Sequence, residues 1–194
     1  RLLALLPEAA PVLVCADFPA ALEVARESGR PHRTFASGEA VRADWRVEEL
    51  RDSPEGLRFV ATGPGERHEL RTPLLGAMNA RNLLGVAALA RERGVSWDAI
   101  AAAASTFHGV RRRQELVVEG ARVLIDDFAH HPTAIRATLQ AVRSRYPERR
   151  VWALFDPRSN TSRRRVFQAE IAEALAGADR VVIGPVHRSE QLEP

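Results

Sequence analysis

The hydrophobic pattern divides the chain into two regions that meet near Gly109. In the first region, short apolar stretches are separated by Gly and Pro, as in strands joined by tight turns, and two runs with helical spacing follow. We expect strands at 12–16, 43–47, 57–62 and 67–70 and helices at 19–28, 79–93 and 97–105. The long helix is expected to bury a face formed by Leu83, Val86, Ala87 and Ala90, and Ser96 is a candidate N-cap for the helix after it.

The second region alternates strands with helices, which predicts an α/β fold with a parallel sheet and right-handed crossovers. We expect strands at 122–126, 151–155 and 180–183 and helices at 133–145 and 164–175. Asp126, Asp127 and His130 follow the first of these strands. A second polar group follows the next strand and consists of Asp156, Arg158, Ser159 and Asn160. Ligands of parallel sheets bind beyond the carboxyl ends of the strands, so both groups are expected at one edge.

Composition narrows the class of protein. Hydrophobic residues make up 45% of the chain, and no apolar run reaches the roughly 20 residues that span a bilayer. No secretory signal pattern is present, and the one cysteine, Cys15, lies in the apolar run VLVCA, where a buried, inert thiol is expected. We therefore expect a cytoplasmic protein.

Every one of the 28 basic residues is arginine. Guanidinium groups bind phosphates and carboxylates through paired hydrogen bonds, so anionic ligands remain possible. The absence of lysine excludes a P-loop within this chain, and no GxxxxGK[ST] motif occurs. If the protein binds ATP, the loop that holds the triphosphate lies outside the sequence given.

Four segments carry residues suited to chemistry. In DDFAHHPTAI (126–135), Asp127 can accept hydrogen bonds from ribose hydroxyls, and His130 or His131 can donate to a phosphate or carboxylate. The alternative is an ordinary helix start, which accounts for Pro132 and Thr133. Adjacent histidines without further ligands at suitable spacing do not favour a zinc site.

In FDPRSNTSRRRVFQ (155–168), the best candidate is Arg158 in the turn. Three arginines at the expected helix start, 163–165, are unfavourable for the helix dipole, so either an anionic ligand offsets them or they form a solvated face. In FHGVRRRQE (107–115), one arginine can reach a bound phosphate. In GAMNARN (76–82), Asn79 and Asn82 are either capping residues or adenine contacts.

Together these segments resemble the Mur ligase family. The family patterns G-x-x-N-x-x-N, F-x-G-V-x-R-R-x-E and D-D-[FY]-[AG]-H-H-P-T all occur here in the same order. Within the family, DDFAHHPTAI and PRSNTSRRRVFQ are more similar to the ligase that recycles murein tripeptide than to the ligase that adds alanine, which usually has Glu where this chain has Ala134.

The resemblance implies a three-domain enzyme. Residues 1–109 would end the central ATP-binding domain, and residues 110–194 would form much of a Rossmann-like C-terminal domain. The nucleotide-sugar domain, the P-loop and the Mg²⁺ ligands would lie outside this chain, so the fragment alone is expected to be inactive. These missing portions would be its partners, and no nucleic acid or membrane partner is expected.

The implied reaction joins the tripeptide L-Ala-γ-D-Glu-meso-diaminopimelate to UDP-N-acetylmuramate through an acyl phosphate, with ATP and Mg²⁺ as cofactors. Alanine addition is the alternative within the family. A nucleic-acid-binding module is the alternative of another class; it rests on the arginine-rich segment, but 25 acidic residues balance the basic ones. A third alternative is an interaction domain without activity.

The nucleotide-side residues follow from matched positions. Asn79 and Asn82 match adenine-side residues of the family. Arg113 matches the hinge arginine near the nucleotide phosphates, and Asp127 matches the ribose-binding aspartate. Met78 stands where many members have His and cannot form the same hydrogen bond, which changes this side of the predicted adenine site.

The acceptor-side residues lie later in the chain. His130 matches a residue near the acyl phosphate or the incoming amine, and it is the one predicted catalytic residue. The positions that match recognition of the incoming peptide's carboxylates are Arg158, Ser159, Asn160 and Arg163. A fixed guanidinium suits that task.

Overall fold

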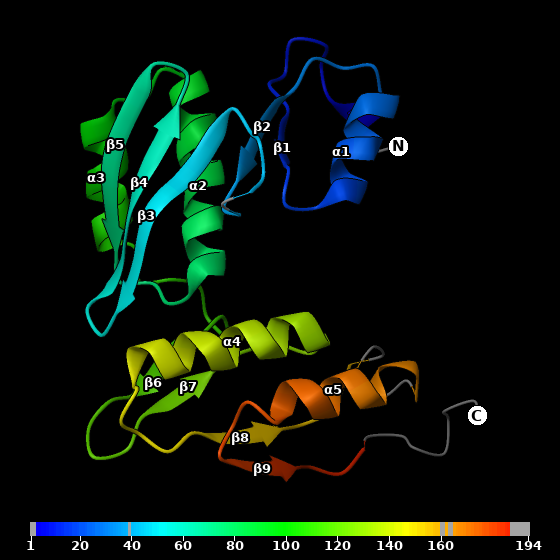
Figure 1. The fold of residues 1–194 in the computed structure, drawn as a ribbon, viewed down its shortest axis with the longest axis vertical. Coiled ribbons are helices and arrows are strands. Elements are labelled where there is room, and N and C mark those ends of the chain that lie inside the picture. Colours follow the sequence, from blue (N-terminus) through cyan, green and yellow to red (C-terminus); the bar gives the residue numbers. More distant parts are fainter. Residues whose placement is uncertain (1–2, 39, 160–161, 163–164, 187–194) are drawn as a thin grey trace. The chain divides into compact units, whose positions relative to one another are not determined.

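The computed structural model describes residues 3–38, 40–159, 162 and 165–186. The chain divides into two compact units, Arg1–His108 and Gly109–Pro194 (Figure 1). The division lies within one residue of the change in hydrophobic pattern. In the described part of the chain, no helix is long and apolar enough to cross a membrane.

The first unit is built on a mixed five-stranded sheet whose strands lie in sequence order. The strands are β1 (Leu13–Cys15), β2 (Arg33–Ala36), β3 (Trp45–Ser53), β4 (Gly56–Gly63) and β5 (Glu66–Thr72). The strands β1 to β3 run parallel, whereas β3 to β5 form antiparallel hairpins. The hairpins were predicted from their turns, but β2 was missed because RTFA begins with two polar residues and shows no apolar run.

Helices cover this sheet and are short or alanine-rich. They are η1 (Leu3–Leu5), α1 (Pro19–Glu27), α2 (Ala77–Glu92) and α3 (Trp97–Thr106). The helix α1 contacts β1, α2 crosses β1 to β4, and α3 contacts β5 (Figure 1). The Ser96 side chain accepts a hydrogen bond from the Ala99 amide, so the predicted N-cap of α3 is confirmed.

One core lies between the sheet and the helices α2 and α3. It contains Trp45, Val47, Leu57, Phe59, Ala61, Leu70, Ala80, Leu84, Ala87, Ala88, Trp97 and Ile100. The predicted buried face of α2 was wrong at Val86, which is 66% exposed. The prediction was correct at Ala87, which is buried, and Leu83 and Ala90 pack partly buried against the core. The other buried positions of the helix are Ala80, Leu84 and Ala88.

A charged contact ties β5 to both helices. The Glu66 carboxylate accepts hydrogen bonds from Arg91 of α2, with Nη2 at 2.5 Å, and from the indole N–H of Trp97 of α3 at 3.1 Å. The His68 ring stacks on Trp97 with its centroid 4.4 Å away. Hydrogen bonds from Arg91 hold the pKa of Glu66 below its usual value.

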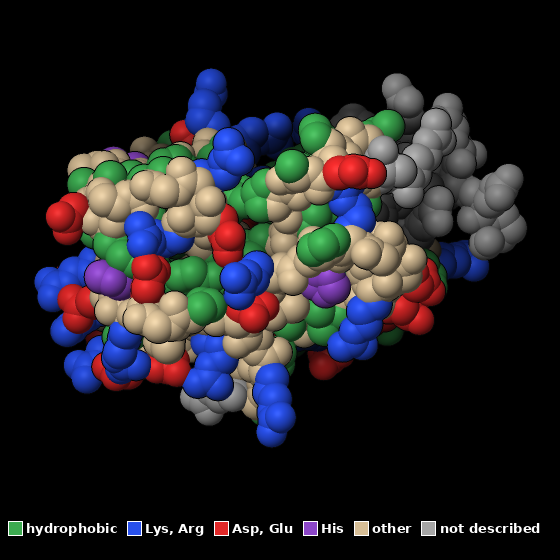
Figure 2. Space-filling view, turned by 90° about the horizontal axis from the view of Figure 1, so that it is seen from above, with side chains coloured by type: hydrophobic (Ala, Val, Ile, Leu, Met, Phe, Trp, Pro, Cys, Tyr) green, Lys and Arg blue, Asp and Glu red, His purple; other side chains and the backbone are tan. Residues whose placement is uncertain are grey.

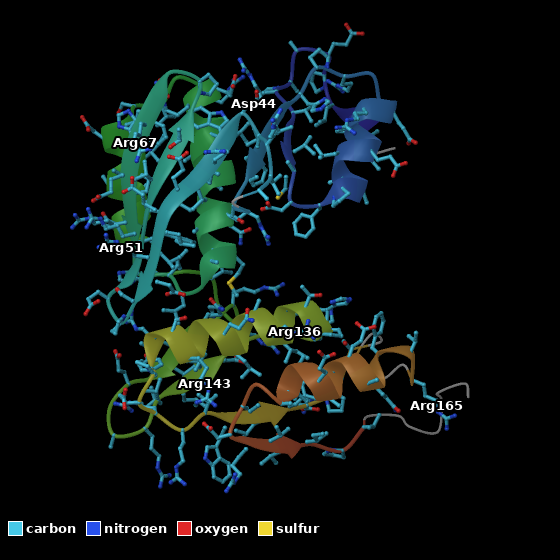
Figure 3. All side chains as sticks on the ribbon, viewed as in Figure 1. Asp44, Arg51, Arg67, Arg136, Arg143 and Arg165 are labelled. Carbon is cyan, nitrogen blue, oxygen red and sulfur yellow. The ribbon has the colours of Figure 1, made fainter. Side chains whose placement is uncertain are left out.

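The outer face of β3 to β5 is covered by ion pairs. Glu48 accepts from Arg46 Nη2 at 2.6 Å and from Arg67 Nη1 at 2.5 Å, and Glu69 bridges Arg58 and Arg71. The arginines of β3 and β5 are seen on this sheet in Figure 3, and basic and acidic side chains are interspersed on the surface in Figure 2. Hydrogen bonds from Arg46 and Arg67 lower the pKa of Glu48 to about 2.

The described part of the second unit contains two two-stranded sheets and two helices. The elements are β6 (Glu115–Val118), β7 (Leu124–Asp126), α4 (Pro132–Arg145), β8 (Trp152–Phe155), η2 (Arg165–Phe167), α5 (Gln168–Leu175) and β9 (Arg180–Ile183). The helices α4 and α5 pack on each other and on β8. Their shared core contains Ile135, Leu139, Val151, Ile171, Ala174 and Leu175.

The predicted α/β fold class is confirmed, since β8 and β9 are parallel and are joined through α5. The predicted pairing of the first strand was incomplete. Among the described residues, β7 pairs with β6 in an antiparallel hairpin, and β6 had been missed. Closing the short loop between β6 and β7 costs little entropy, which favours their pairing as a hairpin. The apolar pattern of the sequence does not show this preference.

The start of α5 also differs from prediction. The helix begins at Gln168 rather than at residue 164, after the short η2 turn that contains Arg165. Its first turn carries Glu170, which suits the positive end of the helix dipole better than arginine does. Arg163 and the neighbouring residue 164 lie outside the described residues.

The ion pairs of Glu48 predict a pH-dependent stability. The folded-state pKa of about 2 lies below the ordinary value of 4.5, so the stabilisation is fully present above pH 4.5 and is lost as the pH falls toward 2. Glu48→Gln should lower the free energy of unfolding by about 1 kcal/mol at pH 7. Urea unfolding at pH 7, 4 and 2.5 would measure the difference from the unchanged protein.

Glu23→Gln, on the exposed surface of α1, is the control and should show no such trend. A difference between Glu48→Gln and the unchanged protein that stays constant from pH 7 to 2.5 would contradict the assignment.

Candidate functional site

The segment before β6 has a strained backbone on either side of Arg113. Arg112 and Gln114 both have positive φ angles, 58° and 51°, although neither is glycine. Such conformations cost of order 1–3 kcal/mol and persist only where neighbouring contacts hold them. The Arg113 amide donates to the Val110 carbonyl at 3.0 Å. The backbone conformation therefore fixes the direction in which the Arg113 side chain points.

The contacts that hold this segment come from the residues after β7. The Phe128 amide donates to the Arg112 carbonyl at 2.9 Å, and the guanidinium carbons of Arg112 and Arg113 each lie 5.4 Å from the centre of the Phe128 ring. The His130 ring meets the same ring edge-on, with centroids 5.0 Å apart. We call Arg112, Arg113, Asp126, Phe128 and His130 the Phe128 cluster.

The two arginines of the cluster differ in whether a carboxylate balances their charge. Arg112 Nε lies 3.8 Å from Asp126 Oδ2, so part of its charge is balanced. The Arg113 guanidinium contacts the Phe128 ring and has no ion pair within the described part of the chain. Its N–H groups can therefore bind an anion. The choice of Arg113 among the three arginines of the hinge stays a prediction, because Arg111 is exposed as well.

Asp127 is held at the start of α4 by both of its carboxylate oxygens. Oδ1 accepts from the Ala129 amide at 3.0 Å and Oδ2 accepts from the Thr138 hydroxyl at 2.7 Å. Each carboxylate oxygen can accept a second hydrogen bond. The carboxylate is thus fixed in place by neutral donors and keeps the capacity to bind a hydroxyl group.

The two histidines have different roles. His131 caps α4, since its Nδ1 accepts from the Thr133 amide at 3.3 Å, a role that the helix-start interpretation had not given to either histidine. His130 Nδ1 lies 2.9 Å from the Phe128 carbonyl, which can only accept. The neutral His130 ring that satisfies this contact carries its proton on Nδ1 and leaves Nε2 as an acceptor.

The second polar group forms a turn of its own after β8. Arg158 is exposed, and its Nε donates to Asp156 Oδ2 at 2.6 Å. Ser159 Oγ accepts from the Ser162 amide at 3.0 Å. Asn160 and Arg163 lie outside the described residues. Among the described residues, Arg158 forms its ion pair with Asp156 of the same turn. That Arg158 lies close to the Phe128 cluster remains a prediction.

In the first unit, the predicted adenine-side residues occupy the start of α2. Asn79 Nδ2 donates to the Leu75 carbonyl at 2.8 Å, and Asn82 Nδ2 lies 3.4 Å from Asn79 Oδ1. Asn79 thus ties the first turn of the helix to the chain before it, but it is not the N-cap of α2, which is Gly76 and makes no side-chain cap hydrogen bond. Asn82 is exposed, so its amide can also meet a ligand.

One group near α2 was missed by sequence reasoning. Asp17, directly after β1, accepts from the Ser37 amide and hydroxyl at 2.9 Å each and from the Gly38 amide at 3.0 Å. Burial alone would raise the pKa of Asp17, but these hydrogen bonds outweigh it and lower the pKa. The available signal was an acidic residue just after a predicted strand. Ligand-binding residues were predicted from this pattern only in the second region.

The anchoring of Asp127 can be tested by removing its side-chain donor. Thr138→Val keeps the shape of the side chain but leaves Asp127 Oδ2 without this hydrogen bond, and it should lower the free energy of unfolding by about 1 kcal/mol. Thr133→Val, in the exposed first turn of the same helix, should have a much smaller effect. Urea unfolding of both variants gives the comparison, and equal losses would argue against the anchor.

The sequence is similar to known proteins, both over the second unit and over most of the chain. Residues 111–193 match the family described as Mur ligase, glutamate ligase domain. The chain is 36% identical over 181 residues to the UDP-N-acetylmuramate–L-alanine ligase of Halorhodospira halophila, covering 90% of this chain and 37% of that protein. A Lactococcus lactis ligase of the same name is 40% identical over 147 residues, 75% of this chain and 33% of its own. The chain thus spans about a third of the curated relatives it matches.

Solved structures agree with these matches. The UDP-N-acetylmuramate–alanine ligase of Thermotoga maritima matches with a TM-score of 0.70 and 27% identity, over 81% of this chain and 35% of that one. The murein peptide ligase of Psychrobacter arcticus matches with a TM-score of 0.62 and 29% identity, over 92% of this chain and 38% of that one. The chain therefore has the fold of the matching part of Mur ligases, and its second unit is similar to the Mur ligase C-terminal domain over residues 111–193.

Proposed function

We propose that this chain is part of an ATP-dependent ligase that forms an amide bond on UDP-N-acetylmuramate. The observation that carries the proposal is the Phe128 cluster, in which Arg113 and His130 lie on one aromatic ring within the unit that matches the family. The anchored carboxylate of Asp127 lies one residue before that ring. This arrangement brings a cation and a proton acceptor close together at the end of β7.

The second unit offers groups that suit a nucleotide. Within the described part of the chain Arg113 has no ion pair, so its N–H groups can bind phosphate oxygens, and Asp127 keeps acceptor capacity for ribose hydroxyls. Asn82 of the first unit offers an exposed amide to adenine, and Asn79 supports it. We assign these four residues to ATP, with the P-loop and Mg²⁺ ligands in the part of the enzyme outside this chain. When bound, Mg²⁺ neutralises charge on the phosphates.

The chemistry needs few groups from this chain. The muramoyl carboxylate attacks the γ-phosphate of ATP, the bond to the β–γ bridging oxygen breaks, and an acyl phosphate and ADP form. The incoming amine then attacks the acyl carbon and displaces phosphate. The amine loses a proton as the amide forms. His130 Nε2 is free to accept that proton, because the Phe128 carbonyl holds the other nitrogen in its protonated form. Arg113 offsets the negative charge that accumulates on the phosphates.

The proposed acceptor is the tripeptide L-Ala-γ-D-Glu-meso-diaminopimelate, which is joined in peptidoglycan recycling. The segments DDFAHHPTAI and PRSNTSRRRVFQ support this choice, as does the likeness to the Psychrobacter arcticus murein peptide ligase. Arg158, Ser159, Asn160 and Arg163 are the residues proposed to recognise the carboxylates of the peptide. The alternative acceptor is L-alanine, which the names of the Halorhodospira halophila and Lactococcus lactis relatives favour.

The rest of the enzyme is the proposed partner of this chain. The relatives are about two and a half times as long as this chain, and residues 1–109 would be the end of their ATP-binding domain. Alone, the chain should not catalyse ligation, because the groups that bind the triphosphate and the nucleotide sugar lie elsewhere. We place the enzyme in the cytoplasm, where ATP and UDP-N-acetylmuramate are available.

The choice of acceptor is tested with the full-length enzyme. Ligation with UDP-N-acetylmuramate and ATP should proceed at least about tenfold more efficiently, in kcat/KM, with the tripeptide than with L-alanine, a difference that corresponds to about 1.4 kcal/mol. Product formation is measured by mass spectrometry and phosphate release. Preference for alanine would select the alternative, and absence of ATP-dependent ligation with either would reject the proposal.

The role of Arg113 has a matched control in the same segment. Arg113→Ala in the full-length enzyme should lower kcat/KM for ATP by about a hundredfold, since a charge that faces the phosphates is lost. Arg111→Ala removes an exposed arginine two residues earlier and should change it less than about twofold. Equal effects of the two substitutions would show that Arg113 acts only through general charge.

A further inference from the structure

Arg81 links the start of α2 to the loop after β1. Its guanidinium carbon lies 4.7 Å from the centre of the Phe18 ring, and its Nη1 lies 3.9 Å from Asp17 Oδ2. The side chains of Arg81 and Asp17 are only 26% and 12% exposed, although both are charged. Arg81 therefore leaves the helix toward the loop and is covered there.

The other end of this link is rigid. Asp17 receives three hydrogen bonds from Ser37 and Gly38, which follow β2, so the loops after two parallel strands are joined at one carboxylate. These bonds keep the carboxylate ionised as a partner for Arg81. The carboxyl ends of parallel strands are also where ligands of such sheets bind. Arg81 thus fixes α2 against the ligand edge of its own sheet.

The start of α2 has no side-chain cap, although Ala80 and Leu84 bury it in the core. Its N-cap, Gly76, has φ 81° and no side chain that could accept from the first amides. The Asn79 side chain donates to the Leu75 carbonyl, and the contact from Asn82 to Asn79 is long, at 3.4 Å. The position of Asn82 therefore depends on how the second turn of the helix is held, and Arg81 lies in that turn.

We propose that Arg81 is a positioning residue for nucleotide recognition, acting through Asn82 while Phe18 and Asp17 hold its guanidinium. The inference rests on the proposed function, because it takes Asn79 and Asn82 as the adenine-side residues. A planar guanidinium can stack on a ring and meet a carboxylate at the same time, which lysine cannot do. The link orients the exposed amide of Asn82 before the nucleotide binds, so that less ordering is needed on binding.

A purely structural role predicts something different. Arg91, near the other end of α2, has a similar set of contacts: it binds Glu66 with two nitrogens and lies 5.5 Å from the Trp97 ring. Those contacts hold the helix to the core and are remote in sequence from the asparagines. If Arg81 merely stabilised the fold, removing Arg91 should have the same effect on ATP binding as removing Arg81.

The experiment compares variants of the full-length enzyme. Arg81→Ala should raise KM for ATP about tenfold and leave kcat and KM for UDP-N-acetylmuramate close to those of the unchanged enzyme. Arg81→Lys should restore only part of the loss, because it keeps the charge without the planar stacking. Phe18→Leu should also raise KM for ATP. Arg91→Ala should lower the melting temperature and leave KM for ATP within about twofold.

The outcomes separate this inference from the proposed function. Asn82→Ala serves as the reference: if it raises KM for ATP and Arg81→Ala does not, the positioning role is overturned and the adenine assignment stands. An Asn82→Ala enzyme with unchanged KM would overturn the adenine assignment and the positioning role with it. Equal increases in KM for Arg81→Ala and Arg91→Ala would reduce Arg81 to a structural residue.

Discussion

The candidate site depends on the Phe128 ring and its backbone amide. The two left-handed residues beside Arg113 would relax if nothing opposed them, and the Phe128 amide holds the first of them through the Arg112 carbonyl. Phe128 itself lies in the turn that Asp127 closes with the Ala129 amide, and Asp127 is anchored to α4 by Thr138. The direction of one arginine is thus set by a chain of contacts that ends on a helix.

Stacking of an arginine guanidinium on an aromatic ring recurs through the molecule. The chain contains no lysine, so every such contact uses arginine. Arg81 lies over Phe18, Arg91 over Trp97, and Arg113 over Phe128. A guanidinium is weakly hydrated and flat, so it covers an aromatic face at little desolvation cost and still has N–H groups at its edge. Each of these contacts joins two different elements or loops of the fold. Arginine here serves packing as much as charge.

Several elements of the fold were predicted from the sequence because neighbouring residues determine them. The turns of the β3 to β5 hairpins, the Ser96 cap and the strand β9 all follow from neighbouring residues. What was missed depends on pairing and packing. The strand β2 has no apolar run and is defined by pairing with β1 and β3, and β6 is defined by its hairpin with β7. On α2 the prediction was wrong at Val86, which is exposed, although the predicted Ala87 is buried.

The site residues show the same division between local and distant information. From its residues alone the sequence left His130 and His131 equivalent, and only the family resemblance selected His130. No pattern predicted that His131 caps α4 or that His130 Nδ1 lies 2.9 Å from the Phe128 carbonyl. Nor does sequence show which hinge arginine is available.

That choice follows from the charge balance around Phe128. Arg112 lies 3.8 Å from Asp126 and gives its carbonyl to the Phe128 amide, so its backbone and side chain both serve the structure. Arg113 shares the ring but has no carboxylate partner in the described chain. A cation held on an aromatic face without a counter-ion is poised for an anionic ligand, because binding then removes an imbalance instead of breaking an ion pair. The neighbouring ion pair is therefore what leaves Arg113 free to act.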